Sequence, residues 1–166
     1  MSPEEEKRLL ALARACVRSA VLGLPPPPLP GMAPAQGVFI TIERGDKVLG
    51  CRGTLTPRFS RLDEELAAAA CSAAAHDPRY RPRQPIDLPP LQVTVTLISR
   101  LEPLEKVAGL RPAEGLVLTA GSKKGIVLPW EGRDPQTRLT WAYRKADVKP
   151  GSYARLQRMI AVSFRG

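Results

Sequence analysis

The chain has 166 residues, 43% of them hydrophobic, which is enough for one core and argues against two independent domains. No apolar run reaches the roughly 18 residues of a membrane-spanning helix and no signal-peptide pattern is present, so we expect a cytoplasmic protein without a membrane partner. The net charge of +9 favours nucleic acid or an acidic partner, although a GC-rich or heat-adapted genome, and with it a thermostable protein, would also explain part of the basic excess.

An amphipathic helix is predicted over residues 1–23. Ser2 can cap it, a proline follows in the first turn, and Glu5 completes a capping box. Apolar residues then recur at helical spacing, which places Cys16 in the core, and Gly23 ends the helix.

Basic residues form a second stripe on this helix, at Lys7, Arg14 and Arg18. Such a stripe is most often a solvated face. The segment 24–36 follows and begins with "LPPPPLP", which excludes a helix or a central strand. We interpret it as a stiff connector and favour a spacer over a ligand for a proline-reading domain.

The first repeated unit, residues 37–99, is predicted to contain a hairpin, a helix and a strand. Alternating apolar residues and the turn "ERGDK" indicate the hairpin, Ser60 with Asp63 is expected to open the helix, and Pro78 stops it near His76. The predicted elements cover residues 37–42, 48–55, 60–76 and 91–99.

The same order of elements returns in a second unit, residues 115–166. A hairpin with the turn "AGSKKG", a helix opened by Asp134 and Pro135, and a closing strand are predicted at similar offsets, which suggests an internal duplication. We therefore predict a single α+β domain whose sheet is mainly antiparallel and is flanked by helices. The elements of this unit cover residues 115–119, 126–128, 134–146 and 156–164.

The cysteines argue against a metal centre. Cys16, Cys51 and Cys71 form no CxxC pair and leave an odd number, as is typical of a reducing compartment. Zinc sites need closely spaced Cys and His ligands, and His76 is the only histidine, so we expect no metal. Cys71, like Cys16, lies on a predicted helix and is expected to face the core.

The stretch Gly50–Gly53, "GCRG", is the candidate site, because glycines in a strand mark a bulge or a close approach. One interpretation is structural: both glycines make room for the alanine-rich helix and Cys51 is a core residue. A second makes Cys51 a nucleophile, with its thiolate favoured by Arg52, His76 as its base, and the amides of the flanking glycines receiving an oxyanion.

A third interpretation is binding without turnover, in which exposed amides with Arg52, Arg79 and Arg83 cradle a phosphate or carboxylate. A fourth is a docking surface for a protein, with "HDPRYRPRQP" at its rim. Binding is favoured over catalysis because only one plausible base exists and no phosphate-binding loop or dinucleotide fingerprint is present. With 5% aromatic residues, RNA binding would be weak, salt-dependent and sequence-tolerant.

Five segments, "GVFITIERGDKVLGCRGTL", "AAAACSAAAHDPRY", "LPPLQVTVTLIS", "GIVLPW" and "YRKADV", are similar in order and spacing to the AMMECR-domain family, the A component of the AmmeMemoRadiSam group. The resemblance runs from about Gly37 onward. Its most specific parts are the glycine-cysteine strand and the turn that contains Asp77, Pro78, Arg79 and Tyr80.

This resemblance implies a duplicated arrangement around one curved antiparallel sheet. It also implies no cofactor, and a suspected part in RNA modification beside Memo-type and radical-SAM partners. The binding residues that it implies, together with the glycine interpretation above, are Gly50, Arg52, Gly53, Asp77, Arg79 and Tyr80.

The chain departs from the family pattern at Leu49, where the family usually has arginine, and at Arg52, where it usually has isoleucine. Positions three apart face opposite sides of an ideal strand, so only a bulge at Gly50 or Gly53 would return the guanidinium to the same side. We further predict that Gly50–Gly53 and the turn 76–80 line one cleft. From helix and strand lengths, this contact requires the loop after residue 55 to double back or the helix to cross the strands obliquely.

Overall fold

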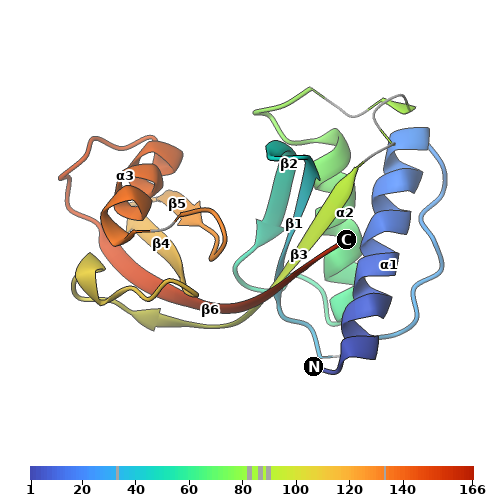
Figure 1. Ribbon diagram of the computed structural model, residues 1–166, viewed down its shortest axis with the longest axis horizontal. Coiled ribbons are helices and arrows are strands. Elements are labelled where there is room, and N and C mark those ends of the chain that lie inside the picture. The colour runs from blue at the N-terminus through green and yellow to red at the C-terminus, as the bar shows by residue number, and fades with distance from the viewer. Residues whose placement is uncertain (33, 82–83, 86–87, 89–90, 133) are drawn as a thin grey trace. The chain divides into compact units, whose positions relative to one another are not determined.

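The computed structural model describes residues 1–32, 34–81, 84–85, 88, 91–132 and 134–166. Within these residues there are three α-helices, a short 3-10 helix η2 and six strands, and the strands form one sheet in the order β2-β1-β3-β6-β4-β5 (Figure 1). This confirms the α+β class. The elements are α1 (Pro3–Leu22), β1 (Gly37–Arg44), β2 (Lys47–Thr54), α2 (Leu62–Ala75), β3 (Gln92–Pro103), η2 (Val107–Gly109), β4 (Gly115–Ala120), β5 (Lys123–Val127), α3 (Pro135–Ala146) and β6 (Arg155–Arg165).

The chain divides into two compact units, one made of Met1–Leu97 with Ser163–Gly166 and the other of Ile98–Val162. Each unit contains a hairpin, then a helix, then a strand. In the sheet order, each hairpin has its second strand at an edge and its first strand inside. The repeated order of elements is therefore present in the structure.

The first helix is capped as its sequence predicts. The Ser2 hydroxyl accepts a hydrogen bond from the Glu5 backbone N–H at 3.2 Å, and the Glu5 carboxylate accepts one from the Ser2 N–H at 2.6 Å. Gly23 ends α1 with a φ of 64°, a left-handed conformation that glycine adopts without strain. Within the described part of the chain, no helix combines the length and the apolar content that crossing a membrane demands.

The start of α2 differs from the prediction. The N-cap is Arg61, without a side-chain cap bond, so the expected cap at Ser60 is wrong. Asp63 instead accepts hydrogen bonds from the Arg61 guanidinium at 2.7 Å and from the Gly31 backbone N–H at 2.6 Å. These bonds, chiefly the one from Arg61, lower the pKa of Asp63 to about 2. The carboxylate that was expected to begin the helix thus fastens the proline-rich connector to it.

Two strands differ most from their predicted bounds. β3 continues to Pro103, and β5 begins at Lys123, inside the stretch that was predicted as a turn. Gly121, at a φ of 59°, reverses the chain tightly enough for Ala120 to pair with Lys123. The turn is shorter than predicted because a glycine in the left-handed conformation allows a hairpin to close with a loop of only two residues.

Each unit has its own apolar core beneath a helix. In the first unit α2 packs on β1 and β2, and α1 packs on α2 (Figure 1). In the second unit α3 packs on β4 and β5. The fully buried members of the two cores include Leu9, Ile40, Ile42, Leu66, Leu116 and Leu118.

The helix α2 runs antiparallel to β2. Near the helix start, the Glu65 carboxylate accepts a hydrogen bond from the Thr54 hydroxyl at 2.6 Å, and near its end Ala73 lies against Gly50. The eight residues from Glu65 to Ala73 rise about 12 Å, and the four from Thr54 back to Gly50 about 13 Å. Because these two lengths are nearly equal, the end of α2 lies beside the glycine-cysteine stretch.

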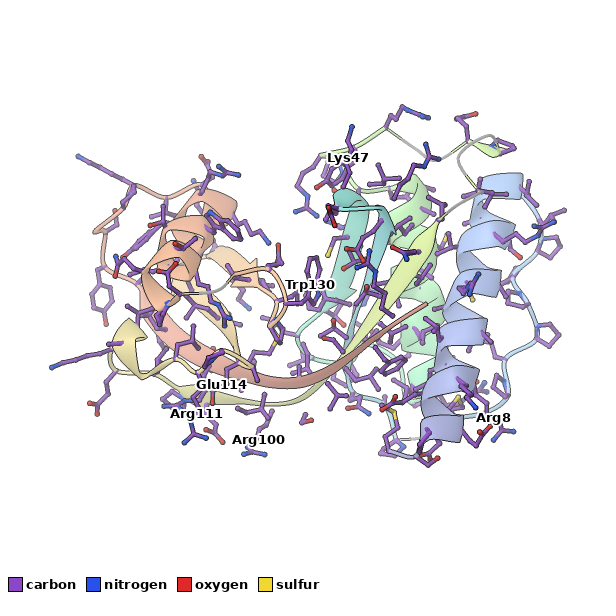
Figure 2. The ribbon with its side chains drawn as sticks, in the orientation of Figure 1. Arg8, Lys47, Arg100, Arg111, Glu114 and Trp130 are labelled. Atoms are coloured by element: carbon purple, nitrogen blue, oxygen red, sulfur yellow. The ribbon has the colours of Figure 1, made fainter. Side chains whose placement is uncertain are left out.

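A buried arginine organises the second unit. Arg138 in α3 has 1% of its surface exposed, and its guanidinium donates to backbone carbonyls at both ends of the turn Arg111–Glu114 and to the carbonyl of Gly132. The Arg111 N–H closes that turn by donating to the Glu114 carboxylate at 2.9 Å; both residues are labelled in Figure 2. Burial lowers the pKa of Arg138. The Arg138 side chain thus supplies hydrogen-bond donors to loop carbonyls that lie outside the helices and strands.

Candidate functional site

A β-bulge sits at the start of the glycine-cysteine stretch. Ile42 pairs with Gly50 and Glu43 with Val48, so Leu49 is the extra residue of β2. Leu49 is buried in the core under the helices, and the Arg52 Nε donates to the Ser72 hydroxyl of α2 at 3.2 Å. The bulge therefore places positions 49 and 52 on the same face of the strand, although positions three apart face opposite sides in an ideal strand.

The two glycines of the stretch serve different neighbours. A Cβ on Gly50 would collide with the carbonyl oxygen of Ala73, so this glycine lets α2 approach the strand closely. A Cβ on Gly53 would lie 2.7 Å from Cγ of Phe39, on the paired strand β1. Only Gly50 thus makes room for the helix, and the space beside each glycine is filled by protein atoms.

The strand and the turn after α2 are joined at Cys51. Its backbone N–H donates to Asp77 Oδ2 at 2.9 Å, and its carbonyl oxygen accepts from Arg79 Nη2 at 2.7 Å. Arg79 also donates from Nε to Asp77 Oδ1 at 3.0 Å and from Nη2 to Oδ2 at 2.8 Å. The structure thus brings Cys51, Asp77 and Arg79 into one hydrogen-bonded group. The chain doubles back between β2 and α2, which is one of the two routes that the predicted lengths allowed.

The electrostatics of this group hold both side chains ionised. Burial opposes ionisation of Asp77, but the hydrogen bonds from Arg79 and from the Cys51 amide outweigh it and lower the pKa of the carboxyl. The hydrogen bond to Asp77 raises the pKa of Arg79. Asp77 has 1% of its side chain exposed and Arg79 has 49%, and the Arg79 guanidinium lies 5.4 Å from the ring centroid of Tyr80. The pair is therefore buried at the carboxylate and open to solvent at the guanidinium.

The Cys51 thiol has a polar neighbour that the other unit lacks. Thr41, which is fully buried on β1, donates its hydroxyl to Cys51 Sγ at 3.3 Å. The equivalent pair next to the equivalent glycine in the second unit is Val117 with Ile126. Since two apolar residues occupy the corresponding positions of the second hairpin, the fold does not require a polar pair there.

His76 is the C-cap residue of α2. Its backbone N–H donates to the Ser72 carbonyl at 2.9 Å, and its side chain is exposed. Among the hydrogen bonds between described residues, none joins the imidazole to Cys51 Sγ. The neighbour of the Cys51 sulfur is the Thr41 hydroxyl, which donates a hydrogen bond and does not act as the base that the sequence analysis assigned to His76.

The remaining expectations have mixed outcomes. Cys16 is buried as predicted, but Cys71 is exposed, so its predicted core position is wrong. Its place on α2 turns it away from the alanine face that contacts the strands. Arg83, named as a third cation, lies outside the described residues. Among the residues with defined positions, no group of three or more His, Cys, Asp or Glu side chains is arranged to hold a metal ion.

Sequence reasoning missed Thr41 and Ser72. Thr41 was assigned only to the alternation of a strand, and Ser72 only to the alanine-rich helix. The turn Gly45–Asp46 alone would pair Thr41 with Gly50, and the bulge at Leu49 shifts its partner to Cys51, so the local pattern did not identify Thr41. No local signal identifies Ser72, because its contact to Arg52 depends on how α2 lies on the strand.

Comparison with known proteins places the chain in a family. The model of the AMMECR1 family matches residues 10–165. A protein of Methanothermobacter thermautotrophicus is 30% identical over 92% of this chain and 88% of its own length, and one of Aeropyrum pernix is 37% identical over 69% of this chain but only 54% of its own length. The crystal structure of the uncharacterised protein PH0010 from Pyrococcus horikoshii is similar with a TM-score of 0.83, at 27% identity, over 99% of this chain and 93% of that one. The chain therefore belongs to the AMMECR1 family.

Proposed function

We propose that this protein is a binding module that recognises an anionic group at the strand–turn site, defined as residues 50–53 with residues 76–80. The observation that carries the proposal is the Asp77–Arg79 pair, which is anchored to the backbone of Cys51 on both its N–H and its carbonyl. The anchored pair fixes a half-exposed guanidinium on the Cys51 carbonyl, and the next residue of this edge strand, Arg52, is a second exposed cation. Preorganised guanidinium groups are suited to phosphate and carboxylate oxygens.

The same contacts favour binding over turnover. An oxyanion needs free backbone N–H groups, and one donor at this place, the Cys51 N–H between the two glycines, is already taken by the Asp77 carboxylate. Atoms of Ala73 and Phe39 occupy the space beside the two glycines that flank Cys51, so these glycines serve packing. What the site offers outward is positive charge on side chains.

The expected ligand is a phosphate-rich chain such as RNA, held mainly through its backbone. The net charge of +9 supports electrostatic attraction, and the low aromatic content argues against stacking platforms for bases. In this proposal the module acts beside Memo-type and radical-SAM proteins in RNA modification, as the family resemblance implies. Recognition would then be sequence-tolerant and regulatory.

The proposal is tested with Arg52→Gln and with Lys47→Gln as the matched control, because both residues are exposed on β2 and each substitution removes one charge; Lys47 is labelled in Figure 2. Binding of polyuridylate and of pyrophosphate is measured over a series of salt concentrations. We expect Arg52→Gln to weaken binding roughly threefold or more and to reduce the salt slope by about one, while the control keeps most of the affinity. Equal losses in both variants, or no binding at low salt, would contradict the proposal.

A second candidate function is cysteine chemistry at Cys51. The Thr41 hydroxyl donates to the sulfur at 3.3 Å, and Arg79 lies close enough for the charge of a Cys51 thiolate to act on it. Both interactions favour a thiolate. Alkylation by iodoacetamide, followed by peptide mapping, tests this candidate: modification of Cys51 faster than of the exposed Cys71, lost in Thr41→Val, would support it. Protection of Cys51 under conditions that label Cys71 would remove it.

A further inference from the structure

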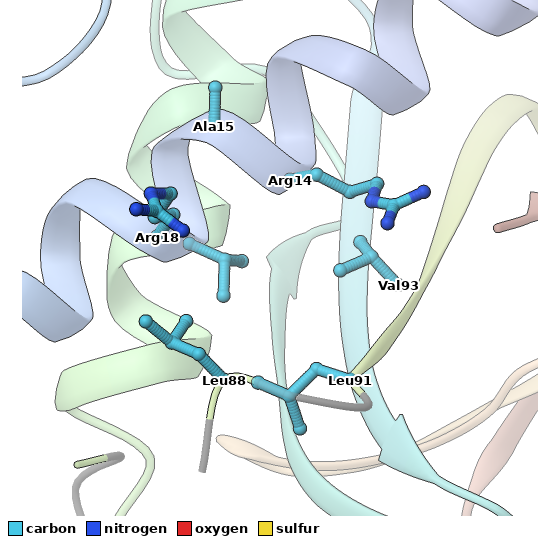
Figure 3. Close-up of a pocket in the computed structure, with 7 residues that line it drawn as sticks. Arg14, Ala15, Arg18, Leu88, Leu91 and Val93 are labelled. Atoms are coloured by element: carbon cyan, nitrogen blue, oxygen red, sulfur yellow. The ribbon is translucent and has the colours of Figure 1, made fainter. Parts of the chain in front are cut away.

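A cavity lies beside α1, between this helix and the segment that enters β3. It has a volume of about 520 Å³, within the range of small-molecule pockets, and shares no lining residue with residues 50–53 or 76–80 (Figure 3). Two elements of the first unit form it, the middle of α1 and the segment that enters β3. Its lining residues are Arg14, Ala15, Val17, Arg18, Leu88, Leu91 and Val93.

The polar part of the cavity is a pair of arginines. Arg14 and Arg18 are exposed and lie four residues apart on α1, so they share one face of the helix. Figure 3 shows the Arg14 guanidinium on the Val93 side of the pocket and the Arg18 guanidinium on the Leu88 side. Like charges at this spacing repel each other, which an anion placed between them would relieve.

Arg14 and Arg18 form no ion pair with a described Asp or Glu side chain, although Gly166 lies close to Arg14, since a Cβ on it would stand 3.9 Å from Arg14 Nη1. The third member of the basic stripe, Lys7, forms an ion pair with Glu4 at 3.0 Å. The stripe therefore contains one paired cation and two that face the cavity. The two arginines without such an ion pair are the members of the stripe that line the cavity, which a stripe that is only solvated does not explain.

The floor of the cavity is apolar and held in place. Val17 and Val93 are 2% exposed, and Leu88 and Leu91 are half-buried. The Leu91 N–H donates to the Leu88 carbonyl at 3.0 Å, and Val93 exchanges two backbone hydrogen bonds with Gly166, at 2.9 and 3.1 Å. The backbone at Leu91 and Val93 is thus held by hydrogen bonds.

We propose that this cavity binds an amphiphilic organic anion, with a carboxylate or phosphate head between Arg14 and Arg18 and an aliphatic body on Val17, Leu88 and Leu91. A bare inorganic anion would leave the apolar floor wet, and a neutral hydrocarbon would bury the stems of two arginines without meeting their charge. Only a ligand with both parts complements both halves of the lining. This site is independent of the strand–turn site and of its proposed function.

The test uses decanoate, decyl phosphate, decanol and acetate as probes of the full chain, by calorimetric titration below the micelle concentration. We expect decanoate or decyl phosphate to bind, decanol to bind at least about tenfold more weakly, and acetate to give no measurable heat. The relative affinities of decanoate and decyl phosphate identify the head group. Equal binding of decanol and decanoate, or no binding by either anion, would overturn the proposal.

Variants locate the binding. Arg14→Gln with Arg18→Gln removes both charges from exposed positions and is expected to weaken decanoate binding by about tenfold or more. Arg8→Gln, on the same helix but outside the lining and labelled in Figure 2, and Arg52→Gln, at the strand–turn site, are the matched controls and should bind as the parent chain does. Thermal unfolding of every variant checks that the fold is kept. Unchanged affinity in the double variant, or equal loss in the controls, would overturn the assignment of this cavity.

Discussion

Gly50 and Ala73 are in contact through a backbone carbonyl that occupies the place where a Cβ on residue 50 would stand. The second unit repeats this contact with Gly125 and Ala142. In both units the glycine lies on the second strand of the hairpin, beneath the C-terminal half of the helix. One packing solution is therefore used twice, which supports the internal duplication at the level of individual atoms.

The first prediction concerns these two glycines. Gly50→Ala and Gly125→Ala should each lower the free energy of unfolding by about 1–3 kcal/mol, because the new methyl group meets backbone that cannot rotate away. Urea denaturation measures the change. Gly109→Ala is the control, since its Cβ would lie 3.5 Å from a Leu104 methyl group, an ordinary contact. Similar losses in all three variants would show that the close approach is not the cause.

The second prediction concerns the ionisation of Asp77. Asp77→Asn should lower the free energy of unfolding at about pH 7 by about 1–2 kcal/mol, since it removes the ion pair with the half-exposed Arg79 but keeps an acceptor for Cys51. The folded-state pKa of Asp77 lies below its unfolded value, so its contribution is fully present above about pH 3.9 and is lost as the pH falls through the folded value. Denaturation at about pH 7 and about pH 3 should show the gap between parent and variant narrowing in acid. A gap that widens as the pH falls would contradict this assignment.

The fold was largely predictable because its signals are local. The capping box of α1, the cap of α3 at Asp134 and the alternation of the hairpin strands all lie within a few residues of the elements that they define. The start of α2 was misplaced because Arg61 supplies no side-chain cap, so no residue type marks the boundary. The early start of β5 was missed because lysines and a glycine are poor strand formers, and pairing with β4 overrides their preference.

The site was predictable only as a neighbourhood. Glycine spacing identified the strand, and the turn with Asp77 was expected beside it, but the bonds that join them connect residues far apart in the chain. The predicted lengths allowed this contact only if the loop after residue 55 doubled back or the helix crossed the strands obliquely, and the structure shows the first route. The helix begins at Leu62, level with the end of β2, and runs back along the strand. The position of a helix along a strand is set by packing, and the spacing of residues in the sequence does not reveal it.

The third prediction concerns Arg138. Arg138→Met should lower the free energy of unfolding by about 3 kcal/mol or more, because several buried carbonyls, including those of Gly132 and Glu114, lose their donor. Arg144→Met, on the same helix but exposed, should change it by less than about 0.5 kcal/mol. Chemical denaturation of the two variants measures the difference. Equal stability of both would mean that water replaces the guanidinium without cost.

The fourth prediction separates two cysteines by reactivity. Burial, with a smaller contribution from the nearby Cys71 thiol, raises the pKa of Cys16 to about 11, so little thiolate forms at neutral pH. In the folded protein at about pH 8, iodoacetamide should label the exposed Cys71 and leave Cys16 unmodified, as judged by mass spectrometry of peptides. Denaturant should abolish the difference. Labelling of Cys16 at a comparable rate without denaturant would contradict its burial.

The strands β2 and β5 are the two ends of the sheet order, where unpaired backbone groups invite another chain to add itself. At Cys51, Asp77 takes the place of an incoming carbonyl and Arg79 that of an incoming amide. The Lys145 ammonium group donates a hydrogen bond to the Ile126 carbonyl at 3.0 Å. Each border is thus closed at its middle by a charged side chain from the helix or turn above it. These side chains occupy edge groups that another strand would otherwise pair with, so we expect a variant that removes them to be more prone to strand addition.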